Sequence, residues 1–237
     1  MVRVLRPFGI FENPVSTVCI WLNGEPEAIG RRGELIWNGA GRRVATDGAF
    51  NEIQKRREKN GDVEWPHAVC GDLDSLTRTR ELANCSLIHL PDQDKTDLTK
   101  TIEWCLEEPT GRSFERFAVL GGLNGRFDHT MSTLSTLATF VNNPKTVVVL
   151  DSRNLVIAVP EAEEVRIELN LEMCSRMCGV IPLAQKETRV TSNGLKYEMN
   201  DLSLAFGQMI SSCNTMTSDR ITLKSTAPVL FTIELSC

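Results

Sequence analysis

The sequence lacks a long apolar run, and it has few of the residues that zinc sites need. No segment approaches the roughly 18 apolar residues of a membrane-spanning helix, and the N-terminal segment lacks the apolar stretch of a signal peptide. No Cys-x-x-Cys pair is present, and the eight cysteines show no repeating spacing. Cys174 and Cys178, with three scattered histidines, do not supply a recognisable zinc site. We therefore expect a soluble cytoplasmic protein with reduced thiols and no membrane partner.

An excess of positive charge is also missing. The chain has 26 Lys and Arg against 31 Asp and Glu, a formal net charge of -5. Nucleic acids and anionic lipid surfaces are bound over broad basic faces, so this balance argues against both as partners. Hydrophobic residues make up 41% of the 237 residues, which is enough to bury the core of one large domain or two small ones.

The first 142 residues contain no repeat and alternate short apolar runs with helical patterns. The runs end in or lead into Gly or Asp, and they cover residues 15–22, 43–46, 66–70, 86–90 and 117–120. This alternation predicts a parallel sheet with helices on its faces. In such sheets ligands bind beyond the carboxyl ends of the strands, which is where the Asp and Gly clusters fall.

Two helices of this half are predicted by apolar spacing. The first helix follows Thr96, and its apolar stripe consists of Leu98, Ile102, Cys105 and Leu106. The second helix follows Arg126, and its apolar stripe consists of Phe127, Met131, Leu134, Ala138 and Val141. Each helix carries a carboxylate in its first turn, where the helix dipole favours negative charge.

The pattern changes after the Asn-Asn-Pro at residues 142–144. Period-two alternation marks residues 145–150, 155–159, 165–169, 194–199, 220–224 and 229–235 as short strands. We therefore predict an α/β protein with a Rossmann-like parallel-sheet domain at residues 1–142, followed by an all-β sandwich domain at residues 143–237.

The aspartates are concentrated at the predicted strand ends. Of eleven in the chain, seven lie there: Asp47, Asp72, Asp74, Asp92, Asp94, Asp97 and Asp128. In Gly-Asp-Leu-Asp-Ser (71–75) the two carboxylates are two residues apart, so on extended backbone they project from one face. Adjacent like charges favour a cation, and oxygen ligands alone point to magnesium. A solvated Asp-rich turn is the alternative.

Two further segments are weaker when taken alone. Asp-Gln-Asp-Lys-Thr-Asp (92–97) has the residues of an ordinary helix cap. Gly-Gly-Leu-Asn-Gly-Arg-Phe-Asp-His (121–129) combines glycines, which allow close approach to phosphate, with Arg126 and Asp128 ahead of a helix. Neither GxxxxGK[ST] nor GxGxxG is present.

Taken together, GDLDS, PDQDKTDLTK and LGGLNGRFDH resemble the signature segments of the thiamin pyrophosphokinase family in its eukaryotic form. The resemblance extends over roughly residues 15–237 and includes ATDGAFN (45–51), CGVIPLAQ (178–185), TSNGLKYEMND (191–201) and LAFGQMISSCNT (204–215).

The resemblance implies transfer of the pyrophosphoryl group of ATP to the hydroxyl of thiamin, giving thiamin diphosphate and AMP, with Mg²⁺. It also implies a homodimer with active sites at the interface. The implied catalytic residues are Asp72, Asp74, Asp97, Arg126 and Asp128, and the implied metal ligands are Asp72, Asp74 and Asp97. The implied ATP-binding residues are Asp47, Gly71, Asp72, Gln93, Thr96, Gly122 and Arg126; those for thiamin are Asp97, Tyr197, Ser211, Ser212 and Asn214. Either Asp97 or Asp128 would take the hydroxyl proton or hold a second metal.

Two departures from the family pattern leave alternatives open. Ser212 and Cys213 stand where relatives have Thr and Ser, and Tyr197 stands where relatives commonly have Trp. Tyr197 could stack on a cationic ring or pack in the sandwich core. These changes motivate a second hypothesis, a thiamin- or nucleotide-binding protein with impaired turnover. A third is a metal-dependent phosphohydrolase that uses the same carboxylates.

Overall fold

The computed structural model describes residues 2–77, 85–108, 113–184 and 186–236. Its internal contacts divide the chain into two compact units. The α/β unit comprises Ile10–Thr136 and Val149–Ser152, and the β-rich unit comprises Met1–Gly9, Leu137–Val148 and Arg153–Cys237. The predicted domain boundary after residue 142 lies between helix α5 (Phe127–Thr139) and strand β7 (Thr146–Leu150) and stays a prediction.

The α/β unit contains the predicted parallel sheet. Its strands run in the order β6 (Arg116–Leu120), β2 (Thr17–Trp21), β3 (Arg42–Thr46), β4 (Ala68–Gly71) and β5 (Ser86–His89), and all neighbours are parallel. Every residue of β2 and β4 is buried, as expected where both faces of a sheet are covered. The first predicted strand is shortened because Pro14–Ser16 form a 3-10 turn.

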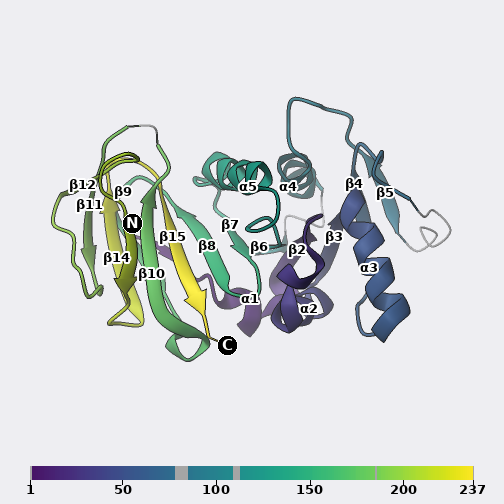
Figure 1. Ribbon diagram of the computed structural model, residues 1–237, viewed down its shortest axis with the longest axis horizontal. Coiled ribbons are helices and arrows are strands. Elements are labelled where there is room, and N and C mark those ends of the chain that lie inside the picture. The colour runs from purple at the N-terminus through teal and green to yellow at the C-terminus, as the bar shows by residue number, and fades with distance from the viewer. Residues whose placement is uncertain (1, 78–84, 109–112, 185, 237) are drawn as a thin grey trace. The chain divides into compact units, whose positions relative to one another are not determined.

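Helices follow the strands as the alternation predicted. Helices α2 (Gly30–Gly39), α3 (Asp47–Asn60) and α4 (Asp97–Glu107) pack on the sheet (Figure 1). A short helix, α1 (Gly9–Glu12), precedes β2. In α4 the predicted apolar face is confirmed, since Leu98, Ile102 and Cys105 are buried. Thr96 caps this helix by accepting a hydrogen bond of 3.2 Å from the N–H of Thr99.

The predicted apolar stripe of α5 is not its buried face. Phe127 is 76% exposed, Met131 is also exposed, and Leu134 and Ala138 are only half-buried. The buried residues of the helix are instead Thr133, Thr136 and Leu137, so the predicted buried face is wrong. Apolar spacing identifies a helix, but it does not show which of its turns a neighbouring element covers.

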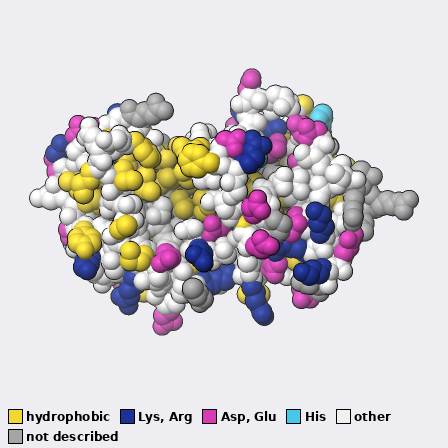
Figure 2. Space-filling model, viewed as in Figure 1, with side chains coloured by type: hydrophobic (Ala, Val, Ile, Leu, Met, Phe, Trp, Pro, Cys, Tyr) yellow, Lys and Arg dark blue, Asp and Glu magenta, His cyan; other side chains and the backbone are white. Residues whose placement is uncertain are grey.

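The β-rich unit contains strands of two sheets. One has the order β1 (Arg3–Leu5), β9 (Ala162–Glu168), β14 (Arg220–Ser225), β11 (Thr188–Asn193) and β12 (Leu202–Leu204). In the other, β13 (Ser211–Thr215), β10 (Cys174–Pro182), β15 (Val229–Leu235) and β8 (Asn154–Val159) are neighbours in that order. Period-two alternation predicted β7, β8, β9, β14 and β15 but missed β1 and β10 to β13. Figure 2 shows hydrophobic side chains gathered on the drawn face over the strands of this unit.

The strand predicted at residues 194–199 is wrong. In this segment Leu195 forms only an isolated bridge with Met216. The N–H groups of Gly194 and Leu195 instead donate to Oε1 of Glu198, at 2.7 and 3.0 Å. A side-chain carboxylate thus replaces the partner strand, and Gly194 adopts a φ of 96°, which closes the chain into a turn.

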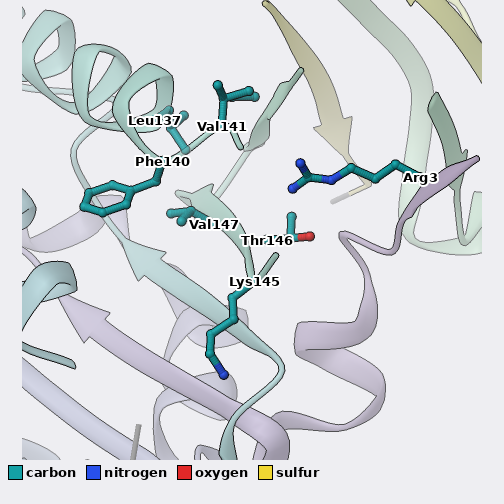
Figure 3. Close-up of a pocket in the computed structure, with 8 residues that line it drawn as sticks. Arg3, Leu137, Phe140, Val141, Lys145, Thr146 and Val147 are labelled. Carbon is teal, nitrogen blue, oxygen red and sulfur yellow. The ribbon is translucent and has the colours of Figure 1, made fainter. Parts of the chain in front are cut away.

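A cavity of about 10 Å³ in the β-rich unit is lined by Leu137, Val141 and Val147, and the guanidinium of Arg3 lies beside it (Figure 3). Arg3 donates a hydrogen bond of 2.6 Å to the carbonyl of Asn143. This volume is on the scale of one water molecule, so the cavity does not take an organic ligand.

Among the described residues, no helix has the length and apolar character needed to cross a membrane.

Candidate active site

A cavity of about 460 Å³ opens in the α/β unit at the carboxyl ends of its strands. This volume is in the range of small-molecule sites, and the position is the one expected for a parallel sheet. Seven of the residues implied by the resemblance line it: Asp47, Asp72, Gln93, Thr96, Asp97, Gly122 and Arg126. The lining also includes residues that the sequence analysis did not select, among them Asn23, Ser75, Lys95, Lys100 and Thr133.

Three carboxylates converge at this edge of the sheet. Asp47, Asp72 and Asp74 each place an oxygen within 4.8 Å of the other two; we call this group the acidic trio. The extended backbone expected between Asp72 and Asp74 is wrong, because Leu73 has a φ of 68°, in the left-handed region. In this turn the N–H of Asp74 donates to Oδ1 of Asp72 at 3.3 Å. The turn therefore brings the two carboxylates together.

Asp47 contributes the buried member of the acidic trio. It is the first residue of α3 and is 3% exposed. Its Oδ1 accepts a hydrogen bond of 2.6 Å from the N–H of Gly48, and its Oδ2 is buried with no hydrogen-bond partner among the described residues. Burial raises the pKa of Asp47, and the charges of Asp97 and Asp72 raise it further. A buried carboxylate oxygen without a partner, beside two other carboxylates, fits a bound cation.

Gly71 makes room for this arrangement. Its φ is 151°, and a Cβ added there would lie 2.9 Å from the carboxylate carbon of Asp47. A larger residue would push against the side chain that closes the acidic trio. Gly71 therefore supports the site through its lack of a side chain.

The acidic trio fits magnesium by its chemistry. Its donors are carboxylate oxygens, without sulfur or imidazole, which is the ligand set that Mg²⁺ prefers. Asp97, the third ligand implied by the resemblance, is not a member of this group. Its Oδ1 lies 2.9 Å from Nζ of Lys100 instead.

Gln93, in the segment after β5, and Lys100, in α4, each bind one of the acidic residues. Gln93 donates a hydrogen bond of 3.0 Å to Oδ2 of Asp72, and this bond is the main reason that the pKa of Asp72 is lowered. Lys100 is buried, and besides Asp97 it binds the carbonyl of Leu90 at 2.9 Å. The sequence analysis missed Lys100, although it lies inside the segment PDQDKTDLTK and one turn after Asp97.

Arg126 lies in a turn rich in glycine and is paired with Asp128. Its Nε and Nη2 donate to the two carboxylate oxygens at 3.1 and 2.5 Å, and both side chains are exposed. This two-fold pairing lowers the pKa of Asp128 to about 2. Gly122, at a φ of 81°, leaves space for the hydroxyl of Thr133, which would lie 2.7 Å from an added Cβ. The turn thus presents the arginine at the edge of the cavity.

The residues implied for thiamin gather within the β-rich unit. Tyr197 is 60% exposed, so the alternative of a core aromatic is wrong. Ser211 and Ser212 lie on β13 beside Cys213, whose thiol is exposed and free. Lys196 places its Nζ 5.4 Å from the centre of the Tyr197 ring. An aromatic face and hydroxyl groups are therefore available to a ligand here.

Asn214 is buried, unlike the residues beside it on β13, and is only 1% exposed. Its Oδ1 accepts from the N–H groups of Tyr197 and Thr215 at 3.0 and 2.8 Å. Its Nδ2 donates to the carbonyl of Tyr197 at 2.8 Å and to the hydroxyl of Ser211 at 3.3 Å. The side chain is thus fully used in holding Tyr197 and Ser211 in place.

A parallel sheet with an acidic trio, an arginine and a glycine-rich turn around a ligand-sized cavity is typical of an enzyme that binds a polyphosphate with a divalent cation. Family models identify the class further. A model described as thiamin pyrophosphokinase, catalytic domain, matches residues 34–150, and one described as thiamin pyrophosphokinase, vitamin B1 binding domain, matches residues 164–230. The chain belongs to the thiamin pyrophosphokinase family.

Individual relatives agree with this assignment. The chain is 55% identical over 237 residues to thiamin pyrophosphokinase 1 of Caenorhabditis elegans, covering 99% of this chain and 96% of that protein. It is 27% identical to thiamine pyrophosphokinase 1 of Oryza sativa subsp. japonica over 85% of this chain and 81% of the relative. The prediction of an enzyme of thiamin diphosphate synthesis is confirmed.

Solved structures show the same fold. The thiamin pyrophosphokinase from Candida albicans superposes with a TM-score of 0.81 at 20% identity, covering 99% of this chain and 93% of that one. The yeast enzyme gives a TM-score of 0.81 at 18% identity, with 99% and 91% covered. The predicted mixed α/β architecture is therefore confirmed at the level of the fold.

Proposed function

We propose that this chain transfers the pyrophosphoryl group of ATP to the hydroxyl of thiamin, giving thiamin diphosphate and AMP, at the cavity of the α/β unit. The observation that carries this assignment is the acidic trio with its unpartnered Asp47 oxygen, since two of its members, Asp47 and Asp72, line a cavity of about 460 Å³. This cavity lies within the α/β unit, most of which is matched by the catalytic-domain model at residues 34–150.

Asp47, Asp72 and Asp74 would hold Mg²⁺, and Asp97 stays a predicted further ligand. When bound, the cation would neutralise negative charge on the polyphosphate. Attack on the β-phosphorus requires little covalent chemistry from the protein, so positioning and charge neutralisation account for most of the catalysis. Gln93 and Thr96 line the cavity on the side of α4, and both would contact ATP.

Arg126 would bind the phosphate oxygens through its planar set of donors. In the structure these donors are used by Asp128, so binding of a phosphate requires the arginine to exchange one partner for another. The exchange costs little free energy, because Asp128, the partner that Arg126 leaves, is exposed to water.

Asp97 is better suited than Asp128 to accept the proton of the thiamin hydroxyl. Asp128 is not among the residues that line the cavity, so it is not placed to reach a bound thiamin hydroxyl there. Asp97 lines the cavity at the first turn of α4, and its carboxylate is oriented by Lys100. We assign the proton to Asp97 for these reasons.

The thiamin-binding residues would be Tyr197, Ser211 and Ser212, with Asn214 holding two of them in position. The ring of Tyr197 would stack on the cationic thiazolium, and the hydroxyls would supply hydrogen bonds.

The parallel sheet of the α/β unit supports a Rossmann-like catalytic domain, and the two sheets of the β-rich unit support a sandwich. Exposed apolar side chains such as Phe206 and Met209 support a homodimer. The cytoplasmic location stays a prediction.

A product assay tests this function. With thiamin, ATP and Mg²⁺, the protein should form AMP and thiamin diphosphate in equal amounts. Release of phosphate from ATP without thiamin would support the phosphohydrolase instead. Calorimetric binding of thiamin without any product would support the impaired binding protein.

A further inference from the structure

Lys100 is a buried residue whose side chain lines the cavity. Its side chain is 5% exposed, and it lines the cavity together with Asp47 and Asp72. A buried charge is costly unless it is paired and hydrogen-bonded. Lys100 meets this condition through two contacts of 2.9 Å, one to Oδ1 of Asp97 and one to the carbonyl of Leu90.

These two contacts join segments that meet at the acidic residues. Leu90 follows β5 directly, and its N–H donates to the carbonyl of Gly71 at 2.8 Å, at the end of β4. Asp97 is the first residue of α4. Lys100 therefore closes residues 90–97 at their two ends, and this segment carries Gln93, the partner of Asp72.

The carboxylate of Asp97 depends on this contact for its orientation. It lines the cavity together with Asp47, a residue of the same charge, and the two carboxylates repel each other. Lys100 binds one of its oxygens from one turn further along α4, so the carboxylate is held at the first turn of the helix.

We propose that Lys100 is a positioning residue for pyrophosphoryl transfer, which holds the carboxylate of Asp97 in the cavity in the orientation that the reaction uses. This inference rests on the proposed function, in which Asp97 acts on the hydroxyl of thiamin. Lys100 acts through Asp97 and not by contact with the reacting atoms.

Lys100→Met tests the inference, because methionine keeps the length and the apolar stem of lysine. The variant should show a kcat about 100-fold lower, with a KM for ATP within about threefold of the wild-type value, since displaced groups near the reaction lower turnover. Circular dichroism should show a folded protein. Lys55→Met, on the exposed side of α3 in the same unit, removes the same charge and should keep the wild-type kcat.

A double-mutant cycle separates positioning from a general structural role. If Lys100 acts through Asp97, the double variant Asp97→Asn with Lys100→Met should turn over no more slowly than Asp97→Asn alone. The double variant also leaves no unpaired buried charge, so it covers the case in which Lys100→Met alone does not fold.

A wild-type kcat in Lys100→Met, or a further large loss in the double variant, would overturn the inference. If the wild-type protein itself forms no thiamin diphosphate, the proposed function fails and this inference fails with it. An active wild-type protein with an unaffected Lys100→Met variant would overturn this inference alone.

Discussion

The side-chain amide of Gln93 donates a hydrogen bond of 3.0 Å to Oδ2 of Asp72. The two residues are far apart in the sequence, one in the turn after β4 and the other in the segment after β5. Since β4 and β5 are parallel neighbours, both segments leave the sheet at the same edge. The contact favours the ionised form of Asp72, the state in which a carboxylate binds a cation.

Gln93→Leu should therefore raise the pKa of Asp72 toward the ordinary value of an aspartate. A lowered pKa contributes stability above the unfolded-state pKa, and that contribution is lost as the pH falls through the folded-state pKa. The variant should accordingly lose less stability on acidification than the wild-type protein. Carboxylate NMR titrations of the metal-free proteins measure the pKa, and an unchanged Asp72 titration would contradict this account.

Asp72→Asn and Asp74→Asn should each reduce turnover by orders of magnitude while the protein stays folded. Removing one charge from the acidic trio relieves repulsion, so the metal-free protein should lose no stability from this cause. Steady-state kinetics and thermal unfolding of the same preparations measure the two effects. If both variants unfold, these residues are structural and the proposed site is wrong.

Asp47→Asn should stabilise the metal-free protein at neutral pH and impair its activity. The pKa of Asp47 is raised by burial, so the ionised carboxylate lowers stability above the folded-state pKa. This penalty decreases as the pH falls and vanishes below the unfolded-state pKa. The increase in Tm caused by the substitution should decrease in the same way, and a Tm difference independent of pH would show that charge is not the cause.

Arg126→Ala should lower kcat/KM for ATP by about 100-fold, the usual effect of removing a donor that stabilises transition-state charge. Arg126→Lys should restore only part of the loss, because an ammonium lacks the planar pair of donors. Neither change should alter stability measurably, since both side chains of the Arg126–Asp128 pair are exposed. Full activity in Arg126→Lys would show that charge alone is sufficient.

Asn214→Ala should mainly lower the stability of the protein, whereas Tyr197→Leu should mainly weaken thiamin binding. The first removes four hydrogen bonds of a buried side chain and should cost about 2–4 kcal/mol of unfolding free energy. The second changes an exposed side chain, so it should weaken thiamin binding with little effect on stability. Denaturant unfolding and thiamin calorimetry distinguish them. Wild-type thiamin affinity in Tyr197→Leu would remove this residue from the proposed site.

Most of the α/β unit could be predicted from local patterns. Apolar runs predicted the strands from β2 to β6, and Thr96 with the stripe from Leu98 to Cys105 predicted the start and buried face of α4. These features depend on neighbours within a few residues, so a single sequence contains the information. The strand predicted at 194–199 is wrong although the contact that prevents it is also local: the carboxylate of Glu198 accepts hydrogen bonds from the N–H groups of Gly194 and Leu195, and this competes with strand pairing.

The sequence by itself determined the family, the acidic and glycine-rich segments at the strand ends, and seven of the residues that line the cavity. Only the tertiary structure decided that Asp47 joins Asp72 and Asp74, that Lys100 is buried against Asp97, and that Asn214 is occupied with Tyr197. The physical reason is that strand order, the left-handed turn at Leu73 and helix packing decide which of these groups meet and which are buried, and the apolar periodicity of the sequence does not encode them.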